Sequence, residues 1–381
     1  IQTLPAERYA ALLINHMRIT APQGEMLERS LRQLADQPYS PELWESVILP
    51  ARVSGYRPEL LDTLLSQGNL FWHITQQHEI SFHLYEDIDW EADMSGVLES
   101  LEGKEKIIYE ALLQRGASFM QRLSGLLDGV TPYDTLLDLA EKGLVCADSF
   151  LPVRQWMNKE NIKSGSIKQR VSARSKALTT GRWEIARPLK ELAIEEKIER
   201  IFDRVAIICR ETVQGLLWTQ VLETLRVWEY TGLARRGYFI EGLSGVQFIR
   251  DKDFVRTMQE LTQPQDEIIW LSAVDPAQPW GKCLPHMQDR SFMNIPGNAV
   301  ALRAGRPIAI FERQGKVLRV FETESLTEAL RVFIKDYARM KILPTQGRLV
   351  IKQYPEEAVD SLAAVGFMHE LQDYVIYRGI M

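Results

Sequence analysis

The stretch "TLRVWEYTGLARRGYFIEG", residues 224–242, joins the end of an amphipathic helix to a strand-like segment through a single glycine. Leu225 and Trp228 are three residues apart, which places both on one face of a helix. Gly232 follows four residues later, and glycine readily takes the left-handed conformation that ends a helix. The stretch therefore predicts a helix that packs on a core through one face and ends abruptly before a β-hairpin.

The same arrangement occurs three more times, in "LLDTLLSQGNLFW" (60–72), "TLLDLAEKGLV" (135–145) and "AVDSLAAVGFM" (358–368). In each copy, apolar residues stand four and seven positions before the glycine, which is Gly68, Gly143 or Gly366. Pairs of strand-like segments follow Gly68, Gly232 and Gly366. A helix, a glycine and a hairpin form the ending of a winged-helix domain, whose last helix can enter a DNA groove.

Unequal intervals separate the glycines, which predicts tandem domains and argues against a solenoid of fixed period. Short strand-like segments with glycine-containing turns fill residues 267–321, and they predict a small β-barrel inserted before the last copy. We therefore predict an α+β chain of tandem winged-helix domains, an inserted small β-barrel and a C-terminal α/β unit. The predicted boundaries are 1–94 (winged helix with N-terminal helices), 95–160 (winged helix), 161–180 (basic linker), 181–262 (winged helix), 263–324 (β-barrel) and 325–381 (α/β unit).

Length and composition fit a cytoplasmic protein of two to four domains, since 381 residues are more than one domain with a single hydrophobic core usually contains. Cys146, Cys209 and Cys283 are far apart, which favours neither disulfides nor a thiolate metal site. The sequence predicts no secretion signal and no membrane span. Its first residue is isoleucine, so we expect a piece of a longer polypeptide.

Charge is distributed unevenly along a chain whose net charge is −6. Residues 79–103 include eight acids and no Lys or Arg, whereas residues 163–190 include eight basic residues and one acid, Glu184. Such asymmetry predicts two surfaces with different partners. We expect the basic surface to meet nucleic acid and the acidic surface to meet protein, because phosphate would be repelled there.

Several longer blocks resemble the C-terminal region of the bacterial Lhr (large helicase-related) family of superfamily 2 ATP-dependent DNA helicases. The likeness covers almost the whole chain and is carried by "WESVILPARVSGYRPELLDTLLSQGNLFW", "GRWEIARP", "SGVQF", "LSAVDPAQPWG" and "NIPGNAVALRAGRPIA". The resemblance implies a role in DNA repair and an extension of tandem winged helices and a β-barrel. It also implies similarity to a helix-turn-helix group of DNA glycosylases, with homo-oligomerisation and, in some members, uracil removal.

The motor of such helicases has no counterpart in these residues. The chain contains no G-x-x-x-x-G-K-[ST] phosphate-binding loop, because the Gly-Lys pairs at Gly103, Gly281 and Gly315 lack the required neighbours. We therefore expect no cofactor in this fragment, and we expect ATP and Mg²⁺ to serve a motor upstream of Ile1.

Candidate DNA contacts lie in the basic stretch and at the start of the third predicted wing. Lysine and arginine neutralise phosphates, while an indole can stack on a base. An alternative interpretation makes the basic stretch a solvated linker, Trp183 a domain-interface anchor and the wing arginines solubility devices. The candidates are Lys168, Arg170, Arg174, Lys176, Arg182, Trp183, Arg235 and Arg236.

Asp275 is the candidate catalytic residue if the chain performs chemistry. Cleavage of an N-glycosidic bond needs a carboxylate near the sugar and a base flipped into a pocket, which Trp270, Trp280 and Asn298 could wall. The alternative is a plain Asx turn that caps the barrel. His73, His78 and His83 are close in sequence without a ligand-like spacing, so we predict no metal site.

These observations favour a DNA-binding and assembly module of an Lhr-type helicase acting in DNA repair. Its expected partners are DNA, either single-stranded or duplex with a single-stranded tail, the upstream helicase core and further copies of the chain. The alternatives are a uracil-type DNA glycosylase within the winged-helix and β-barrel region, or an oligomerisation scaffold alone.

Overall fold

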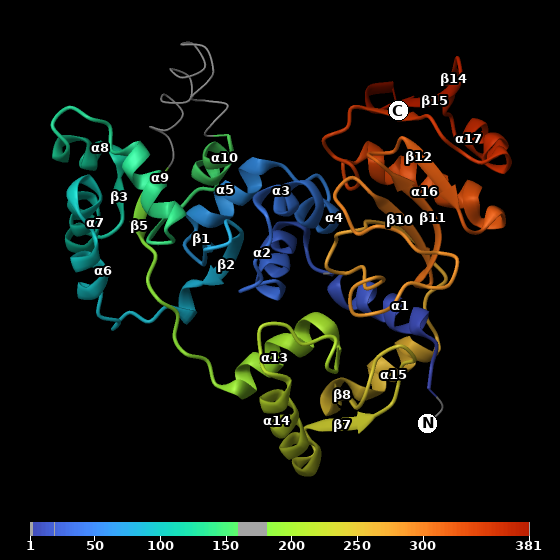
Figure 1. Ribbon diagram of the computed structural model, residues 1–381, viewed down its shortest axis with the longest axis horizontal. Coiled ribbons are helices and arrows are strands. Elements are labelled where there is room, and N and C mark those ends of the chain that lie inside the picture. The colour runs from blue at the N-terminus through green and yellow to red at the C-terminus, as the bar shows by residue number, and fades with distance from the viewer. Residues whose placement is uncertain (1–2, 19, 159–180, 381) are drawn as a thin grey trace. The chain divides into compact units, whose positions relative to one another are not determined.

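The computed structural model of the chain describes residues 3–18, 20–158 and 181–380 as helices and short antiparallel sheets (Figure 1). Two compact units make up the chain. One contains Ile1–Met26, Ser46–Tyr56 and Leu192–Met381, and we call it the large unit; the other contains Leu27–Glu45 and Arg57–Glu191, and we call it the small unit. No helix among the described residues is both long and apolar enough to cross a membrane.

A buried β-hairpin forms one part of the small unit. Helix α5 (Pro58–Ser66) leads into β1 (Leu70–Ile74), which pairs with β2 (Ile80–Leu84). The indole of Trp44 lies edge-on to Phe82 of β2, and its nitrogen donates to the carbonyl of Ile80 at 2.8 Å. The preceding helical segments are α2 (Gln23–Gln33), α3 (Pro41–Leu43), a π-helical turn (Trp44–Ile48) and α4 (Leu49–Arg52).

A three-stranded sheet forms the other part of the small unit, in the order β3-β5-β4. Its central strand is β5 (Arg182–Ile185), so residues just after the predicted linker complete a sheet begun before it. The predicted boundary at residue 181 stays a prediction. The other elements are α6 (Ser95–Ser100), α7 (Gly103–Arg115), β3 (Ser118–Phe119), α8 (Met120–Leu123), α9 (Tyr133–Glu141), β4 (Val145–Ala147) and α10 (Leu151–Met157).

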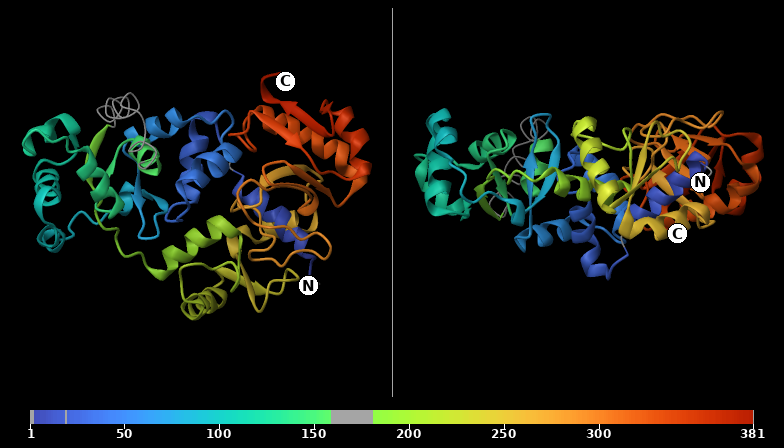
Figure 2. Two further views of the ribbon diagram at one scale, coloured as in Figure 1. Left: turned by 45° about the horizontal axis from the view of Figure 1, so that its top comes forward. Right: turned by 90° about the horizontal axis from the view of Figure 1, so that it is seen from below.

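A winged-helix arrangement occupies part of the large unit. Helices α13 (Ile194–Val205) and α14 (Trp218–Thr231) pack beside a sheet of order β6-β8-β7, and the N-terminal helix α1, blue in Figure 2, contacts α13. The hydroxyl of Tyr9 on α1 donates to the carbonyl of Val205. The remaining elements are α1 (Ala6–Met17), β6 (Ile207–Ile208), β7 (Ala234–Gly237), β8 (Gln247–Arg250) and α15 (Phe254–Thr262).

The prediction of a closed β-barrel at residues 263–324 is wrong. In the described residues, β9 (Ile268–Ser272), β10 (Ala299–Arg303), β11 (Arg306–Glu312) and β12 (Val317–Val320) form an open antiparallel sheet of order β12-β11-β10-β9. Helix α16 (Leu326–Ala338) covers the sheet instead. Trp270 of β9 donates to the carbonyl of Ala329 at 2.7 Å and packs edge-on to Phe333, both on α16.

The C-terminal residues share that core. Strands β13 (Arg348–Ile351), β14 (Met368–Glu370) and β15 (Asp373–Tyr377) form a sheet of order β13-β15-β14, with α17 (Val359–Ala364) before the β14–β15 hairpin. Buried side chains from β9, β11, α16, β13 and β15 belong to one apolar cluster. The sheet and the predicted α/β unit are therefore packed as one body.

The glycine pattern that opened the sequence is confirmed at all four positions. Gly68, Gly143, Gly232 and Gly366 have φ angles of 77°, 71°, 78° and 97° and follow α5, α9, α14 and α17. Antiparallel hairpins follow the first, third and fourth. The strand after Gly143, β4, pairs with β5, which begins only at Arg182, so no tight hairpin follows this glycine.

Candidate nucleic-acid interface

Helix α14 packs on its domain through one apolar face. Val221, Leu225 and Trp228 recur every three or four residues and are at most 6 % exposed. Trp228 stacks on Phe202 of α13, with 6.2 Å between ring centroids. The left-handed Gly232 then ends the helix. Because this face packs inward, the opposite face of α14 points toward solvent.

That outward face carries side chains suited to nucleic acid. Arg226 is exposed, Val227 is 59 % exposed and Tyr230 is 93 % exposed. A guanidinium can contact phosphate, and an exposed phenol ring can stack on a base or contact sugar. Sequence reasoning missed Arg226 and Tyr230. The signal that identifies them is their distance of two residues from the buried Trp228, which places them on the far side of the helix.

The hairpin after α14 carries the two predicted wing arginines, Arg235 and Arg236, on β7. The side chain of Arg235 is 54 % exposed, pairs with Asp251 at 2.6 Å and lies 4.4 Å from the ring centre of Phe254. Arg236 is 53 % exposed and lies 3.4 Å from a carboxylate oxygen of Glu229. Exposed ion pairs contribute only about 0–1 kcal/mol, so phosphate can replace either carboxylate at low cost. Their role as DNA contacts stays a prediction.

The corresponding helix α5 in the small unit contacts protein through Asp62, while Glu59, Thr63 and Ser66 stay exposed. Asp62 accepts hydrogen bonds from the backbone N–H of Phe150 at 2.7 Å and from the guanidinium of Arg154 at 2.7 Å. The hairpin after α5 is also packed, because every residue of β1 and β2 except His73 is buried. Trp72 of β1 donates to the carbonyl of Ser149 at 2.9 Å. This helix and hairpin do not present a wing to solvent.

Helix α9 is buried on nearly all sides. Asp134 is the one exposed residue along its described length, while Leu136 and Leu139 are fully buried. A helix in this state cannot lie in a DNA groove, because its side chains already contact protein. Among the three segments predicted as winged helices, and within the described residues, α14 and β7–β8 alone combine an exposed helix face with an exposed hairpin.

The other predicted DNA contacts fall in two places. Trp183 is fully buried and packs edge-on to Tyr133, and its role as a DNA contact or as a domain-interface anchor stays a prediction. Arg182 is half exposed and pairs with Asp148 at 2.8 Å. Four basic candidates lie outside the described residues: Lys168, Arg170, Arg174 and Lys176.

Asp275 is fully buried in the large unit and fully bonded. The guanidinium of Arg52 donates to both of its carboxylate oxygens at 2.9 Å, and the backbone N–H of Ala277 donates to one of them at 2.8 Å. The ammonium of Lys282 bonds the backbone carbonyl of Asp275. A carboxylate held in this way is a buried counter-ion, and the catalytic role of Asp275 stays a prediction without support from this geometry.

The residues expected to wall a pocket beside Asp275 have structural partners. Trp270 is stacked on Phe311 in the apolar core. The indole of Trp280 donates to the carbonyl of Gly305, and Asn298 bonds the backbone of residues 293 and 313. These contacts explain the burial of all three side chains without a ligand.

The three neighbouring histidines have separate partners in the small unit. His83 lies 2.6 Å from Asp36, His73 bonds the carbonyl of Gly143, and His78 lies 3.7 Å from Glu141. Within the residues that the structure describes, no group of three or more His, Cys, Asp or Glu side chains is arranged to hold a metal ion.

Comparison with known proteins bears on these domains. Two family models, of the third and fourth domains described as "Large helicase-related protein, winged-helix domain", match residues 5–85 and 187–268. Two segments of the chain therefore match winged-helix domains of the Lhr family. The second match contains α14 and the β7–β8 hairpin, so the exposed helix and wing lie within an Lhr winged-helix domain.

Two curated relatives extend the likeness to most of the chain. "Lhr helicase/ probable uracil glycosylase" of Mycolicibacterium smegmatis is 27 % identical over 370 residues, which is 85 % of this chain and 24 % of that protein. "Lhr helicase/uracil glycosylase" of Escherichia coli is 27 % identical over 355 residues, which is 80 % of this chain and 23 % of that protein. The resemblance to Lhr is confirmed, and the chain spans about a quarter of the length of these relatives.

A solved structure also resembles the chain at low similarity. The DNA glycosylase AlkZ of Streptomyces sahachiroi is 11 % identical, with a TM-score of 0.46 over 89 % of this chain and 97 % of that one. At this level of similarity we assign no residue role from AlkZ to this chain.

Proposed function

We propose that this chain is a DNA-binding part of an Lhr-type ATP-dependent DNA helicase acting in DNA repair, and that α14 with the β7–β8 hairpin contacts the DNA. The observation that carries the proposal is the exposure of Tyr230, Arg235 and Arg236 on one Lhr winged-helix domain. The proposal assigns ATP and Mg²⁺ to motor domains in the remainder of the helicase polypeptide.

The charge of this surface predicts binding of moderate strength. Each wing arginine already lies beside a carboxylate, Asp251 or Glu229, and Glu223 is exposed on α14. Phosphate must therefore compete with protein carboxylates for the guanidinium groups. We expect affinity that falls with added salt, with a slope set by a few phosphate contacts.

A salt series on labelled DNA tests the proposal. Duplex, single-stranded and tailed DNA are titrated with the wild-type chain and with Arg235→Ala/Arg236→Ala. Each lost phosphate contact lowers the log–log salt slope by about 0.9, so the double variant loses nearly two units. Arg348→Ala is the matched control, because Arg348 has the same exposure and a carboxylate partner but lies on β13. An unchanged slope in the double variant contradicts the proposal.

Uracil removal is a second candidate, because both curated relatives carry "uracil glycosylase" in their names. The chain is incubated with uracil-containing DNA and then with alkali, and strand cleavage shows that the base was removed. Asp275→Asn abolishes cleavage if Asp275 is the catalytic carboxylate. Loss of cleavage counts as catalytic only if the variant stays folded, because Asp275 also neutralises Arg52.

Self-association completes the set of proposals for this chain. Light scattering of the chain alone gives its mass in solution. An oligomer that shows no DNA signal at low salt identifies an assembly scaffold and excludes the DNA-binding proposal. An oligomer that binds DNA with the expected slope is compatible with both roles.

A further inference from the structure

A small cavity in the small unit is lined by residues from several elements. Its volume is about 140 Å³, and its lining comes from β1, α7, β4, β5 and the segment after β2. A cavity of roughly 150 Å³ holds one benzene ring, whereas drug-sized ligands occupy about 300–1,000 Å³. The volume therefore matches one six-membered ring more closely than a fused bicyclic base.

Flat apolar side chains form part of the cavity wall. Phe71 of β1 and Trp90 both line it, and Trp90 is 58 % exposed despite its large apolar ring. The guanidinium of Arg187 lies 5.7 Å from the ring centre of Trp90. Such aromatic surfaces bind planar heterocycles by stacking.

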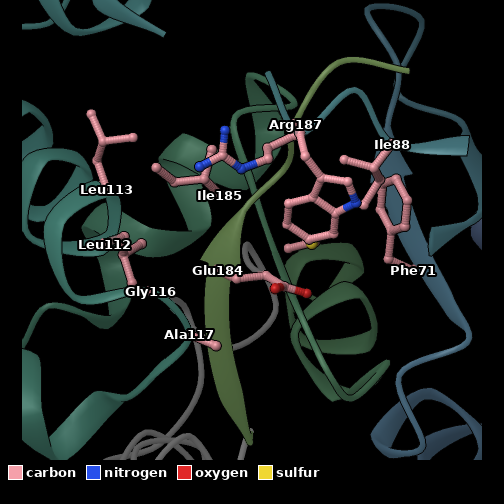
Figure 3. A pocket seen from close by; sticks show the side chains of 11 residues that line it. Phe71, Ile88, Leu112, Leu113, Gly116, Ala117, Glu184, Ile185 and Arg187 are labelled. Atoms are coloured by element: carbon pink, nitrogen blue, oxygen red, sulfur yellow. The ribbon is translucent and has the colours of Figure 1, made fainter. Parts of the chain in front are cut away.

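One carboxyl group is directed into this apolar space. Glu184 is on β5, and its side chain lines the cavity together with that of Ile185. Figure 3 shows the carboxyl group of Glu184 extending from the strand toward the side on which Phe71 lies, with Arg187 above it. Within the described residues no hydrogen bond to this carboxyl group is present, so its oxygens are available to a ligand.

The surroundings keep about half of the Glu184 carboxyl groups protonated at neutral pH and most of them at about pH 6. Burial raises the pKa of its carboxyl group to about 7, and the positive charge of Arg187 opposes that rise. The other titratable lining group is the thiol of Cys146 on β4, whose pKa burial raises to about 12. Tyr109 of α7 lies close enough to Arg187 for its pKa to be affected, and burial holds that pKa above its usual range. Phe71, Ile88, Trp90 and Leu112 add no charge.

A protonated carboxyl group presents one O–H donor beside one carbonyl acceptor. Uracil and thymine present the complementary pair on one ring edge, an N–H donor beside a carbonyl acceptor. Cytosine presents the same pair as an amino donor beside a ring nitrogen. Either edge therefore makes two parallel hydrogen bonds to the acid form of Glu184, and an ionised carboxylate would lose one of them.

We propose that this cavity binds a single pyrimidine base, which packs on Phe71 and Trp90 and forms paired hydrogen bonds with the carboxyl group of Glu184. The base would come from an unpaired nucleotide of bound nucleic acid. In this respect alone the inference rests on the proposed DNA-binding function. Binding of the base itself requires the cavity alone.

Free nucleosides therefore test the cavity without DNA. Deoxyuridine, deoxycytidine and deoxyguanosine are titrated into the full chain at about pH 6 and about pH 8, and binding is followed by broadening of the nucleoside NMR signals. Both pyrimidines bind and deoxyguanosine does not. Pyrimidine affinity falls about tenfold between the two pH values, because the protonated fraction of a group with a pKa of about 7 falls by that factor.

Two variants of Glu184 distinguish hydrogen bonding from simple packing. Glu184→Gln keeps a donor beside an acceptor, so it retains pyrimidine binding and loses the pH dependence. Glu184→Leu fills the space with apolar atoms and abolishes binding. Glu191→Gln is the matched control, because Glu191 is exposed in the same unit and its loss leaves the wild-type pH profile. Unfolding midpoints of all variants show that they are folded.

Several outcomes overturn the inference. Equal binding of deoxyguanosine, pyrimidine binding that persists in folded Glu184→Leu, or no nucleoside binding at either pH each contradicts it. DNA binding through α14 and the wing is measured separately with the Arg235→Ala/Arg236→Ala variant. Failure of the cavity and failure of the DNA-binding proposal are therefore distinguishable.

Discussion

The carboxylate of Asp275 neutralises the buried guanidinium of Arg52 and so stabilises the fold. Both side chains are almost fully removed from solvent, and Arg52 also donates to the carbonyl of Ile48 in the preceding π-helical turn. Removal of one partner from a buried pair leaves the other charge unneutralised. The residue that looked catalytic in the sequence is therefore tied to the packing of the 46–56 segment within the large unit.

We expect Asp275→Asn to lower the free energy of unfolding by roughly 3–5 kcal/mol, the usual cost of leaving a buried charge unpaired. Urea unfolding at neutral pH measures the loss. Asp289→Asn is the control, because Asp289 is exposed in the same loop and asparagine tolerates its left-handed backbone. If Asp275→Asn unfolds at the wild-type midpoint but fails to remove uracil, Asp275 is catalytic and its structural role is secondary.

Glu184 predicts an opposite dependence of stability on pH from that of an ordinary surface acid. Its pKa is about 7 in the folded chain and 4.5 in the reference state, so between those values the folded state binds more protons. The free energy of unfolding therefore falls as pH rises from about 4.5 to 7. The loss is no more than about 3.5 kcal/mol, since one pKa unit corresponds to about 1.4 kcal/mol.

Glu184→Gln removes this titration, and Glu191→Gln does not. The stability of Glu184→Gln relative to wild type should increase between about pH 5 and pH 8, as measured by denaturant unfolding at each pH. A difference that stays constant over this range shows that Glu184 ionises normally. In the sequence Glu184 was visible only as the one acid in a basic stretch. Its cavity is assembled from residues 71 to 187 and was not predictable locally.

At the scale of elements, periodicity predicted which faces of the glycine-terminated helices pack inward. Residues four and seven positions before each glycine are buried or partly buried in the structure. The outward faces were not predictable, because their fate depends on distant contacts. Asp62, six positions before Gly68 on α5, is paired with Arg154, 92 residues later, whereas Arg226, six positions before Gly232 on α14, is exposed.

Helix α14 offers two aromatic residues, two positions apart, with opposite expected roles. Trp228→Ala opens the core beside Phe202 and should cost roughly 3–5 kcal/mol of unfolding free energy. Tyr230→Ala should leave stability unchanged and weaken single-stranded DNA binding by roughly 1–3 kcal/mol if the ring stacks on a base. Unfolding and DNA titration are measured on both variants. Wild-type DNA affinity in Tyr230→Ala would exclude stacking by this residue.

At the scale of the whole molecule, the sequence predicted the strands between residues 267 and 321 and missed how they are covered. Turn residues and alternation indicate each strand locally. Whether a sheet closes or packs under a helix depends on side chains outside the segment. Here Trp270 bonds Ala329, and Phe311 packs against Phe333 of α16 with 4.6 Å between ring centroids.

This shared core predicts that residues 263–324 are not stable without the residues that follow them. A chain truncated after residue 324 lacks α16, β13 and β15, whose buried side chains complete the apolar cluster. Hydrogen exchange of the β9–β12 amides should then lose its protection, because one face of the sheet is exposed to water. Amides of α14 and β8 act as the internal reference, since their core contains no residue beyond 248. Persistent protection in β9–β12 would show instead that residues 263–324 form an independent domain with the boundaries that the sequence predicted.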